Sequence, residues 1–311
     1  MKKVAVTGGA GFIGSHLAEE LAGRGYHVIV IDDLSTGKMA NIEPLLKRVN
    51  VEFVQGCITD LPLLRNLFQG VYCVFHQAAI PSVPRSIDNP QATHNVNATG
   101  TLNVLLAARE SGVKKVIYAS SSSVYGDTPT LPKAEDMAPN PQSPYAVTKL
   151  TGEYYCQVFH QVYSLATVCL RYFNVYGPRQ NPESQYAAVI PIFIKRAYEN
   201  KPPIIFGDGE QTRDFTFVKD VAEANILVAE SDASGVFNIG SGESITINQL
   251  ASLSIKLMGK SDITPIYEEP RLGDIRDSLA NIVRAGTFGY FPKYSLEEGL
   301  RETVRIYKDE K

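Results

Sequence analysis

The 311-residue sequence has no tryptophan, only four cysteines, no long hydrophobic segment and little net charge. The cysteines are scattered without a Cys-x-x-Cys pair, which argues against a disulfide scaffold or a metal site and favours reduced thiols in the cytoplasm. No apolar run approaches the roughly 18 residues that a transmembrane helix requires, and glycines interrupt the apolar N terminus before a signal peptide can form. The formal charge of −3 gives no reason to expect nucleic acid or a membrane as partner.

Two hydrophobic periodicities alternate along residues 1–170. Short runs rich in β-branched residues are typical of buried parallel strands: Lys3–Thr7, His27–Ile31, Val51–Val54, Cys73–Phe75, Val116–Ala119 and Ala166–Leu170. Helical patterns lie between several of them: Ile13–Arg24, Leu61–Phe68, Asn97–Ser111 and Tyr145–Tyr163. This alternation predicts an α/β fold with a doubly wound parallel (Rossmann) sheet.

The rest of the chain is less regular, with proline-rich joints and helical patterns at Ile247–Met258 and Leu296–Tyr307. We expect it to form a smaller α/β substrate-binding domain on the carboxyl ends of the sheet strands, where open α/β sheets bind ligands. The expected bounds are 1–172 plus 211–240 for the sheet domain, and 173–210 plus 241–311 for the smaller one.

A glycine-rich segment, Gly8-Gly9-Ala10-Gly11-Phe12-Ile13-Gly14, follows the first strand and opens the first helix. Small residues there let the backbone approach a pyrophosphate, and the helix N terminus supplies N–H groups and partial positive charge. A tight turn without a ligand would look similar, but Asp32 closes the second strand, where a carboxylate can bind the adenosine ribose. Asp32 and Asp33 would repel a 2′-phosphate, so the sequence predicts NAD rather than NADP.

Tyr145 and Lys149 stand four residues apart, on one face of a predicted helix. An ammonium beside a phenol lowers the pKa of the phenol from about 10 towards neutrality, so Tyr145 could act as a general base. Such a pair is often an ordinary surface pair. Here, however, a serine run leaves the end of a buried strand and would place Ser121 beside Tyr145 at the same edge of the sheet. The combination favours a catalytic site.

With these motifs the chain resembles the extended short-chain dehydrogenase/reductase family, in its UDP-sugar 4-epimerase branch, over essentially its whole length. Further matching motifs are His76-Gln77-Ala78-Ala79, Asn97–Thr101, Arg171–Pro178, Gly207–Phe215 and Arg271–Asp274. The resemblance implies that Ser121, Tyr145 and Lys149 are catalytic. It implies that NAD contacts Gly8, Gly11, Phe12, Ile13, Gly14, Asp32, Ile58, Gln77, Ala78, Ala79, Asn97, Tyr145, Lys149 and Phe173.

The resemblance also implies a UDP-sugar substrate. Asn174, Arg213 and Arg271 would hold the diphosphate, which forked guanidinium groups suit well, and Asp274 would hold the uridine ribose. For each arginine, a surface ion pair is the alternative. The remaining implied substrate contacts are Ala188, Val189 and Phe206 at the uracil, and Ser122, Ser123 and Ser278 near the sugar.

Three positions discriminate between the reactions of this family and between its substrates. Nucleotide-sugar 4,6-dehydratases carry Asp-Glu, and sugar-acid decarboxylases carry Glu, directly before Val-Tyr-Gly, where this chain has Ser122-Ser123. A hydroxyl cannot replace Glu as the acid/base of elimination, so a 4-epimerase is favoured. Ser278 stands where 4-epimerases restricted to glucose and galactose have a bulky Tyr, so we expect interconversion of UDP-GlcNAc and UDP-GalNAc, with UDP-glucose and UDP-galactose as further candidates.

Other interpretations stay open: a UDP-glucose/galactose or UDP-glucuronate 4-epimerase, or a nucleotide-sugar dehydrogenase or reductase that releases its cofactor. Members of the family commonly dimerise through a four-helix bundle, which here implies a homodimer through Asn97–Ser111 and Tyr145–Tyr163. One departure is Gly56-Cys57-Ile58, where the family usually has Gly-Asp-Ile or Gly-Asp-Val. Because a thiol is a weak acceptor, we expect looser retention of NAD.

Overall fold

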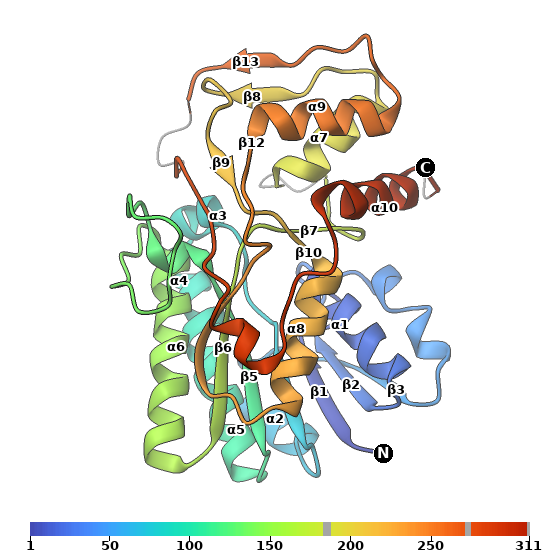
Figure 1. Ribbon diagram of the computed structural model, residues 1–311. Helices are drawn as coiled ribbons and strands as arrows, with labels where there is room; N and C mark the ends of the chain where they lie inside the picture. Colours follow the sequence, from blue (N-terminus) through green and yellow to red (C-terminus); the bar gives the residue numbers. More distant parts are fainter. Residues whose placement is uncertain (183–187, 271–274, 310–311) are drawn as a thin grey trace.

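The computed structural model describes residues 1–182, 188–270 and 275–309. Its centre is a seven-stranded sheet in the order β11-β6-β5-β4-β1-β2-β3, in which every neighbouring pair is parallel (Figure 1). The strands are β1 (Lys3–Thr7), β2 (His27–Asp32), β3 (Val51–Gln55), β4 (Cys73–His76), β5 (Lys115–Ser121), β6 (Ala166–Tyr172) and β11 (Gly235–Ile239). The six predicted strands are confirmed, and β11 is an addition that the hydrophobic runs did not indicate.

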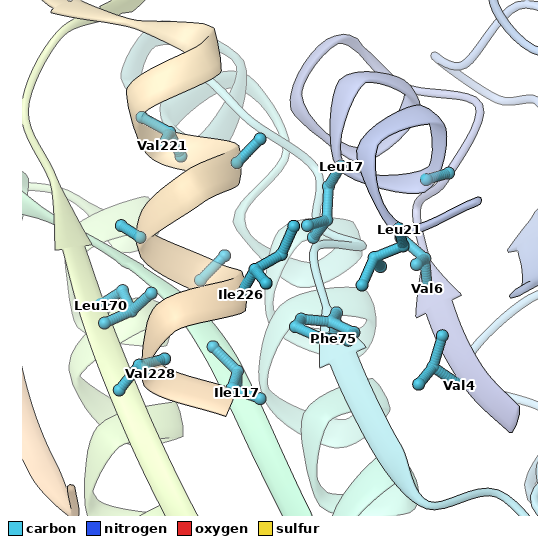
Figure 2. Close-up of a cluster of buried hydrophobic side chains, with 14 of the residues drawn as sticks. Val4, Val6, Leu17, Leu21, Phe75, Ile117, Leu170, Val221, Ile226 and Val228 are labelled. Carbon is cyan, nitrogen blue, oxygen red and sulfur yellow. The ribbon is translucent and has the colours of Figure 1, made fainter. Parts of the chain in front are cut away.

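Helices cover both faces of this sheet. One face carries α1 (Phe12–Gly23) and α8 (Val218–Glu230), and the other carries α2 (Leu61–Leu67), α5 (Gly100–Glu110) and α6 (Pro144–Tyr163). Side chains alternate along each strand, so Val4 and Val6 pack against α1 and α8 while Ala5 packs on the opposite face. Figure 2 shows Leu17 of α1 and Ile226 of α8 meeting near Phe75 of β4. This arrangement confirms the doubly wound Rossmann architecture.

A smaller layer lies above the carboxyl ends of the sheet strands (Figure 1). Its helices are α7 (Val189–Tyr198), α9 (Ile247–Met258) and α10 (Leu296–Asp309). Three two-stranded ladders complete it: β7 (Val175–Tyr176) with β10 (Thr216–Phe217), β8 (Ile204–Phe206) with β13 (Ile266–Glu268), and β9 (Thr212–Arg213) with β12 (Ile245–Thr246). It has its own apolar core, in which Phe193, Ile205, Leu250 and Leu300 are buried.

Short helical segments complete the edge that faces this layer. They are α3 (Val83–Asp88), α4 (Pro90–His94), a π-helical turn (Asn95–Thr99) and a 3₁₀ turn (Ser122–Tyr125). Further 3₁₀ turns lie at Met39–Asn41, Leu45–Lys47 and Ala285–Phe288. The predicted helix Asn97–Ser111 is thus a π turn that continues into α5, so its first residues are wound more widely than we expected.

Within residues 1–182, 188–270 and 275–309, every helix is too short or too polar to cross a membrane. The same residues contain no group of three or more His, Cys, Asp or Glu side chains that could hold a metal ion.

Candidate active site

The glycine loop joins β1 to α1 and leaves no room for side chains. Gly8 has a φ of 70°, and a Cβ there would lie 2.6 Å from the backbone nitrogen of Ala78. A Cβ at Gly14 would lie 2.2 Å from the carbonyl oxygen of Gly8. Among the described residues, no side chain caps the N terminus of α1, which begins with Phe12 and Ile13 after Gly11. This bare backbone fits a dinucleotide pyrophosphate.

Asp32 at the end of β2 is 7% exposed and anchors the loop. Its Oδ2 accepts from the N–H of Ala10 at 3.0 Å, and its Oδ1 accepts from the N–H of Leu34 at 2.8 Å. Burial raises the pKa of Asp32, and these backbone hydrogen bonds oppose the rise. Gly37, which sequence reasoning missed, is needed here, because a Cβ at that position would lie 2.7 Å from Oδ1. The carboxylate therefore suits a ribose hydroxyl.

A buried histidine connects the glycine loop to the next two elements. His76 ends β4 and contacts the hydroxyls of Thr7 (2.8 Å, Nδ1) and Thr101 (2.9 Å, Nε2). Thr101 donates to the carbonyl of Asn97, so it must accept from Nε2–H, which makes Nδ1 the acceptor for Thr7. Burial lowers the pKa of His76 to about 3, consistent with this neutral form. Thr7 Oγ1 also accepts from the N–H of Ala78 at 3.3 Å.

The other predicted cofactor contacts lie along the same edge of the sheet. Asn97 is buried and both donates to and accepts from the backbone of Ile80, which fixes the turn after Ala78 and Ala79. Gln77 donates to the Tyr172 hydroxyl at 3.1 Å. Ile58 follows β3 and packs so closely on Gly100 that a Cβ there would lie 2.6 Å from Ile58 Cδ1. Phe173 follows β6 and is buried beside Tyr125, with ring centroids 6.2 Å apart.

Helix α6 begins at a point fixed by its sequence. Ser143 caps it by accepting from the N–H of Ala146 at 3.2 Å, and Pro144 takes the first helical position. The N–H of Tyr145, which helical bonding leaves unpaired, donates to Ser86 Oγ of α3 at 3.0 Å. These contacts place Tyr145 in the first turn, and Ser86 is a second residue that the sequence did not indicate.

Ser121, Tyr145 and Lys149 come together at the end of β5. Lys149 is 4% exposed and donates from Nζ to the carbonyl of Ala119 at 2.7 Å. Its Nζ lies 5.7 Å from the centroid of the Tyr145 ring. Burial lowers the pKa of Lys149 to about 8.

The pKa of Tyr145 differs from the sequence expectation. We expected Lys149 to lower it, but burial raises it, and a hydrogen bond with Ser121 opposes that rise. The expectation was wrong for the protein alone, because burial of the phenol, and not the charge of Lys149, sets the direction of the shift. Ser121 itself accepts from the N–H of Ser123 at 3.2 Å and so caps the 3₁₀ turn.

The two serines expected near the sugar lie in that turn. Ser122 and Ser123 are half-buried. Within the described part of the chain, Ser123 Oγ is buried without a hydrogen-bond partner. An unpaired buried hydroxyl is costly unless a ligand satisfies it. Ser123 therefore suits a polar substrate group.

Half of the predicted substrate residues line one cavity of about 290 Å³ in the smaller layer. Of those predicted, it is lined by Asn174, Ala188, Val189, Phe206 and Arg213. Apolar side chains form much of the wall, which fits a flat base. Arg213 Nη1 donates to the carbonyls of Thr212 at 2.9 Å and Arg276 at 3.0 Å, which fixes its guanidinium beside the cavity.

A buried aspartate holds Asn174, one of the residues that line this cavity. Asp214, 0% exposed, accepts from the backbone of Ser241, Gly242 and Ala280, and its own carbonyl accepts from Asn174 Nδ2 at 2.8 Å. Asn174 Nδ2 also lies 3.4 Å from Ser278 Oγ. The structure thus brings Asn174 and Ser278 together, while Arg271 and Asp274 lie outside the described residues.

Comparison with known proteins agrees with this geometry. Residues 4–240 match the profile of the NAD dependent epimerase/dehydratase family. A putative UDP-glucose 4-epimerase of Methanocaldococcus jannaschii is 40% identical over 98% of both chains. The structure of a UDP-N-acetylglucosamine 4-epimerase from Methanobrevibacter ruminantium, in complex with UDP-N-acetylmuramic acid, is 43% identical, with a TM-score of 0.96 over 100% of this chain and 99% of the other.

A third relative carries the cofactor. The UDP-glucuronic acid 4-epimerase of Bacillus cereus, in complex with UDP-glucuronic acid and NAD, is 37% identical, with a TM-score of 0.92 over 99% of this chain and 100% of the other. The NAD prediction is therefore confirmed at the level of the family, and so is the resemblance to epimerases. The chain belongs to the NAD dependent epimerase/dehydratase family.

Proposed function

We propose that this protein is a UDP-sugar 4-epimerase that interconverts UDP-GlcNAc and UDP-GalNAc through a 4-keto intermediate. The observation that carries the N-acetyl preference is the small side chain of Ser278, whose hydroxyl lies 3.4 Å from the amide of Asn174, a residue that lines the cavity. The hydroxyls of Ser122 and Ser123, in place of carboxylates, support epimerisation over dehydration or decarboxylation. Ser122 would contact the acetamido group, and Ser123 Oγ would bond the sugar.

The reaction needs a general base, a hydroxyl that helps to transfer the proton, and residues that bind the diphosphate. Tyr145 would take the proton of the sugar 4-hydroxyl and return it after the keto sugar has turned over. Ser121 would hydrogen-bond O4 and help the proton pass, and Lys149 would bind the nicotinamide ribose. Asn174, Arg213 and Arg271 would hold the diphosphate throughout, so that only the sugar turns.

NAD, when bound, supplies the hydride acceptor for C4, and its positive charge would lower the pKa of a phenol placed beside it. We propose that the glycine loop holds its pyrophosphate and Asp32 its adenosine ribose. The other residues proposed to contact it are Phe12, Ile13, Ile58, Gln77, Ala78, Ala79, Asn97, Tyr145, Lys149 and Phe173. On the substrate side, Ala188, Val189 and Phe206 would line the uracil pocket and Asp274 would bind the uridine ribose.

The test is NMR of the purified protein with UDP-GlcNAc without added NAD, and then with UDP-glucose. Appearance of UDP-GalNAc, formed faster than UDP-galactose, is the expected result. Turnover of UDP-glucose alone would overturn the N-acetyl preference and leave the 4-epimerase. Conversion of UDP-glucuronate alone, or accumulation of stoichiometric NADH, would replace the proposal by a uronate epimerase or a dehydrogenase.

The proposal extends to the compartment, the division into two units and the oligomeric state of the enzyme. Four cysteines in the free thiol state fit a cytoplasmic enzyme. We propose residues 1–172 plus 211–240 as the NAD-binding unit and 173–210 plus 241–311 as the nucleotide-sugar unit. The short strands β9 and β10 of the first unit pair with β12 and β7 of the second and so connect the two. We also propose a homodimer through α5 and α6, supported by exposed apolar side chains along α6.

A further inference from the structure

Helix α6 carries a third ionisable residue on the face that holds the catalytic pair. Tyr145, Lys149 and Glu153 follow one another at intervals of four residues, so their side chains lie in one row along the helix. Glu153 is 4% exposed, as buried as Lys149. The proposed reaction does not use it directly.

The carboxylate of Glu153 is bound to two strands of the sheet. Its Oε1 accepts from Ser120 Oγ at 2.5 Å and from Arg171 Nε at 2.9 Å, and its Oε2 accepts from Arg171 Nη2 at 2.7 Å. Ser120 precedes Ser121 at the end of β5, and Arg171 lies opposite Ser120 in β6. The carboxylate therefore ties α6 to the strand that presents Ser121.

Arg171 balances the buried charge of Glu153 and lies against an aromatic ring. It is 3% exposed, and its guanidinium carbon lies 4.6 Å from the centroid of the Tyr125 ring. Hydrophobic replacements can stabilise a fold as well as a buried ion pair does, so stability alone does not account for this pair. An electrostatic effect on its neighbours is the alternative explanation.

Among the described residues, Glu153 is the anion whose charge acts on the Lys149 ammonium. The ammonium lies 5.2 Å from the Tyr118 ring centroid on β5 and 5.7 Å from that of Tyr145. His76 on β4 is neutral, because burial lowers its pKa to about 3. Burial likewise lowers the pKa of Lys149 to about 8, and the negative charge of Glu153 opposes that fall.

We propose that Glu153 is a positioning residue of the epimerase: its carboxylate fixes α6 against the ends of β5 and β6, and its charge keeps Lys149 as an ammonium. This rests on the proposed function, in which Lys149 acts as a cation beside Tyr145. Without the Glu153 charge, Lys149 would lose its proton at a lower pH. The enzyme would then lose activity in the neutral range.

The decisive measurement is an NMR pH titration of Lys149 Nζ in ¹⁵N-lysine-labelled protein, with the signal identified by its loss in Lys149→Met. We expect Glu153→Gln to lower the pKa of Lys149 by about one unit. Glu153→Gln leaves the Arg171 charge buried and unpaired. The second variant is therefore Glu153→Gln/Arg171→Gln, in which both charges of the ion pair are removed and two side-chain amides remain to form hydrogen bonds. The pKa of Lys149 should fall in this double variant as well, because the charge of Glu153, and not that of Arg171, opposes the effect of burial on Lys149.

Arg171→Gln is the matched control, because it keeps the Glu153 charge and should not lower the pKa of Lys149. In active protein, the alkaline limb of the pH–kcat profile should move with the NMR pKa. A Lys149 pKa that is unchanged in the folded variants would overturn the proposal. The NMR titration gives this answer even if the protein converts no UDP-sugar. Failure of the proposed function can therefore be distinguished from failure of the Glu153 proposal.

Discussion

The side-chain amide of Asn174 donates a hydrogen bond to the hydroxyl of Ser278 at 3.4 Å, across 104 residues of sequence. Asn174 adopts a φ of 26°, unusual for a residue with a side chain, and the carbonyl of Asp214 holds its amide at 2.8 Å. The residue proposed to hold the diphosphate is thus in contact with the residue proposed to select the sugar. A larger side chain at position 278 would displace this amide or enter the space that we assign to the sugar.

Ser278→Tyr should therefore convert the enzyme to one that prefers unmodified hexoses. The added ring would occupy the space that we assign to the N-acetyl group, so kcat/KM for UDP-GlcNAc should fall by at least roughly tenfold relative to UDP-glucose. Ser278→Ala, which removes the hydroxyl without adding bulk, is the control and should keep the original preference. Steady-state kinetics on both substrates decide the matter, and an unchanged ratio in Ser278→Tyr contradicts the assignment.

Tyr145→Phe should abolish most of the activity while leaving binding intact. General acid–base catalysis contributes about 10²- to 10⁴-fold, and removal of the phenol oxygen takes this away without altering the packing of the ring. We expect kcat to fall in that range, with NAD and UDP-sugar still binding by calorimetry. Tyr154→Phe, an exposed position on the same helix, is the matched control. Near-normal kcat in Tyr145→Phe would remove Tyr145 from the mechanism.

The sequence predicted what depends on local pattern and missed what depends on contact across the fold. Continuous apolar runs mark β1 to β6 because both faces of a parallel sheet are buried, and the helical pattern over Tyr145–Tyr163 falls within α6. The network around His76 joins hydroxyls on β1 and α5, and no local pattern announces such a meeting. The pKa of Tyr145 was misjudged because spacing reports a nearby lysine but does not report how deeply the phenol is buried.

Stability should fall on acidification below pH about 6.5. Burial lowers the pKa of His16 to about 4 and that of His76 to about 3, whereas an unfolded histidine titrates near pH ~6.5. Between these values the unfolded chain binds more protons than the folded one. The stabilisation that the two histidines contribute is therefore fully present above pH ~6.5 and decreases as the pH falls towards the folded pKa values. From pH 7 to 5 each histidine should cost about 2 kcal/mol, measurable by urea unfolding.

His16→Gln separates this effect from general acid sensitivity. His16 Nε2 donates to the carbonyl of Pro178 at 3.0 Å, a bond that a glutamine amide can replace. In this variant, the part of the decrease in the free energy of unfolding that the two histidines cause should be about half as large as in the parent protein. His160→Gln, at an exposed position, is the control and should show the full decrease. Identical pH dependence in His16→Gln and the parent protein would contradict the assignment.

Cys57→Asp should slow the loss of NAD. The thiol of Cys57 accepts only from Thr59 Oγ1, at 3.2 Å, among the bonds that the described residues make to it, and a thiol is a weak acceptor for an adenine amine. A carboxylate would provide a strong one. NAD retained after repeated dialysis should increase in Cys57→Asp and stay unchanged in Cys57→Ser. Equal retention in the aspartate variant and the parent would show that position 57 does not hold the adenine.

Charged substitutions on the exposed face of α6 should dissociate the proposed dimer into monomers. Val147, Tyr154, Val158 and Val162 are 48%, 54%, 45% and 65% exposed and recur at helical spacing, which leaves an apolar stripe along the helix. Exposed stripes of this kind mark interaction surfaces, and a second copy of α6 would cover it with an equally apolar face. We expect a dimer by analytical ultracentrifugation, and a folded monomer for Val158→Glu/Val162→Glu. Lys256→Glu, at an exposed position on α9, changes the net charge by the same amount and is the control; it should remain dimeric. A parent protein that sediments as a monomer at micromolar concentration would refute the interface.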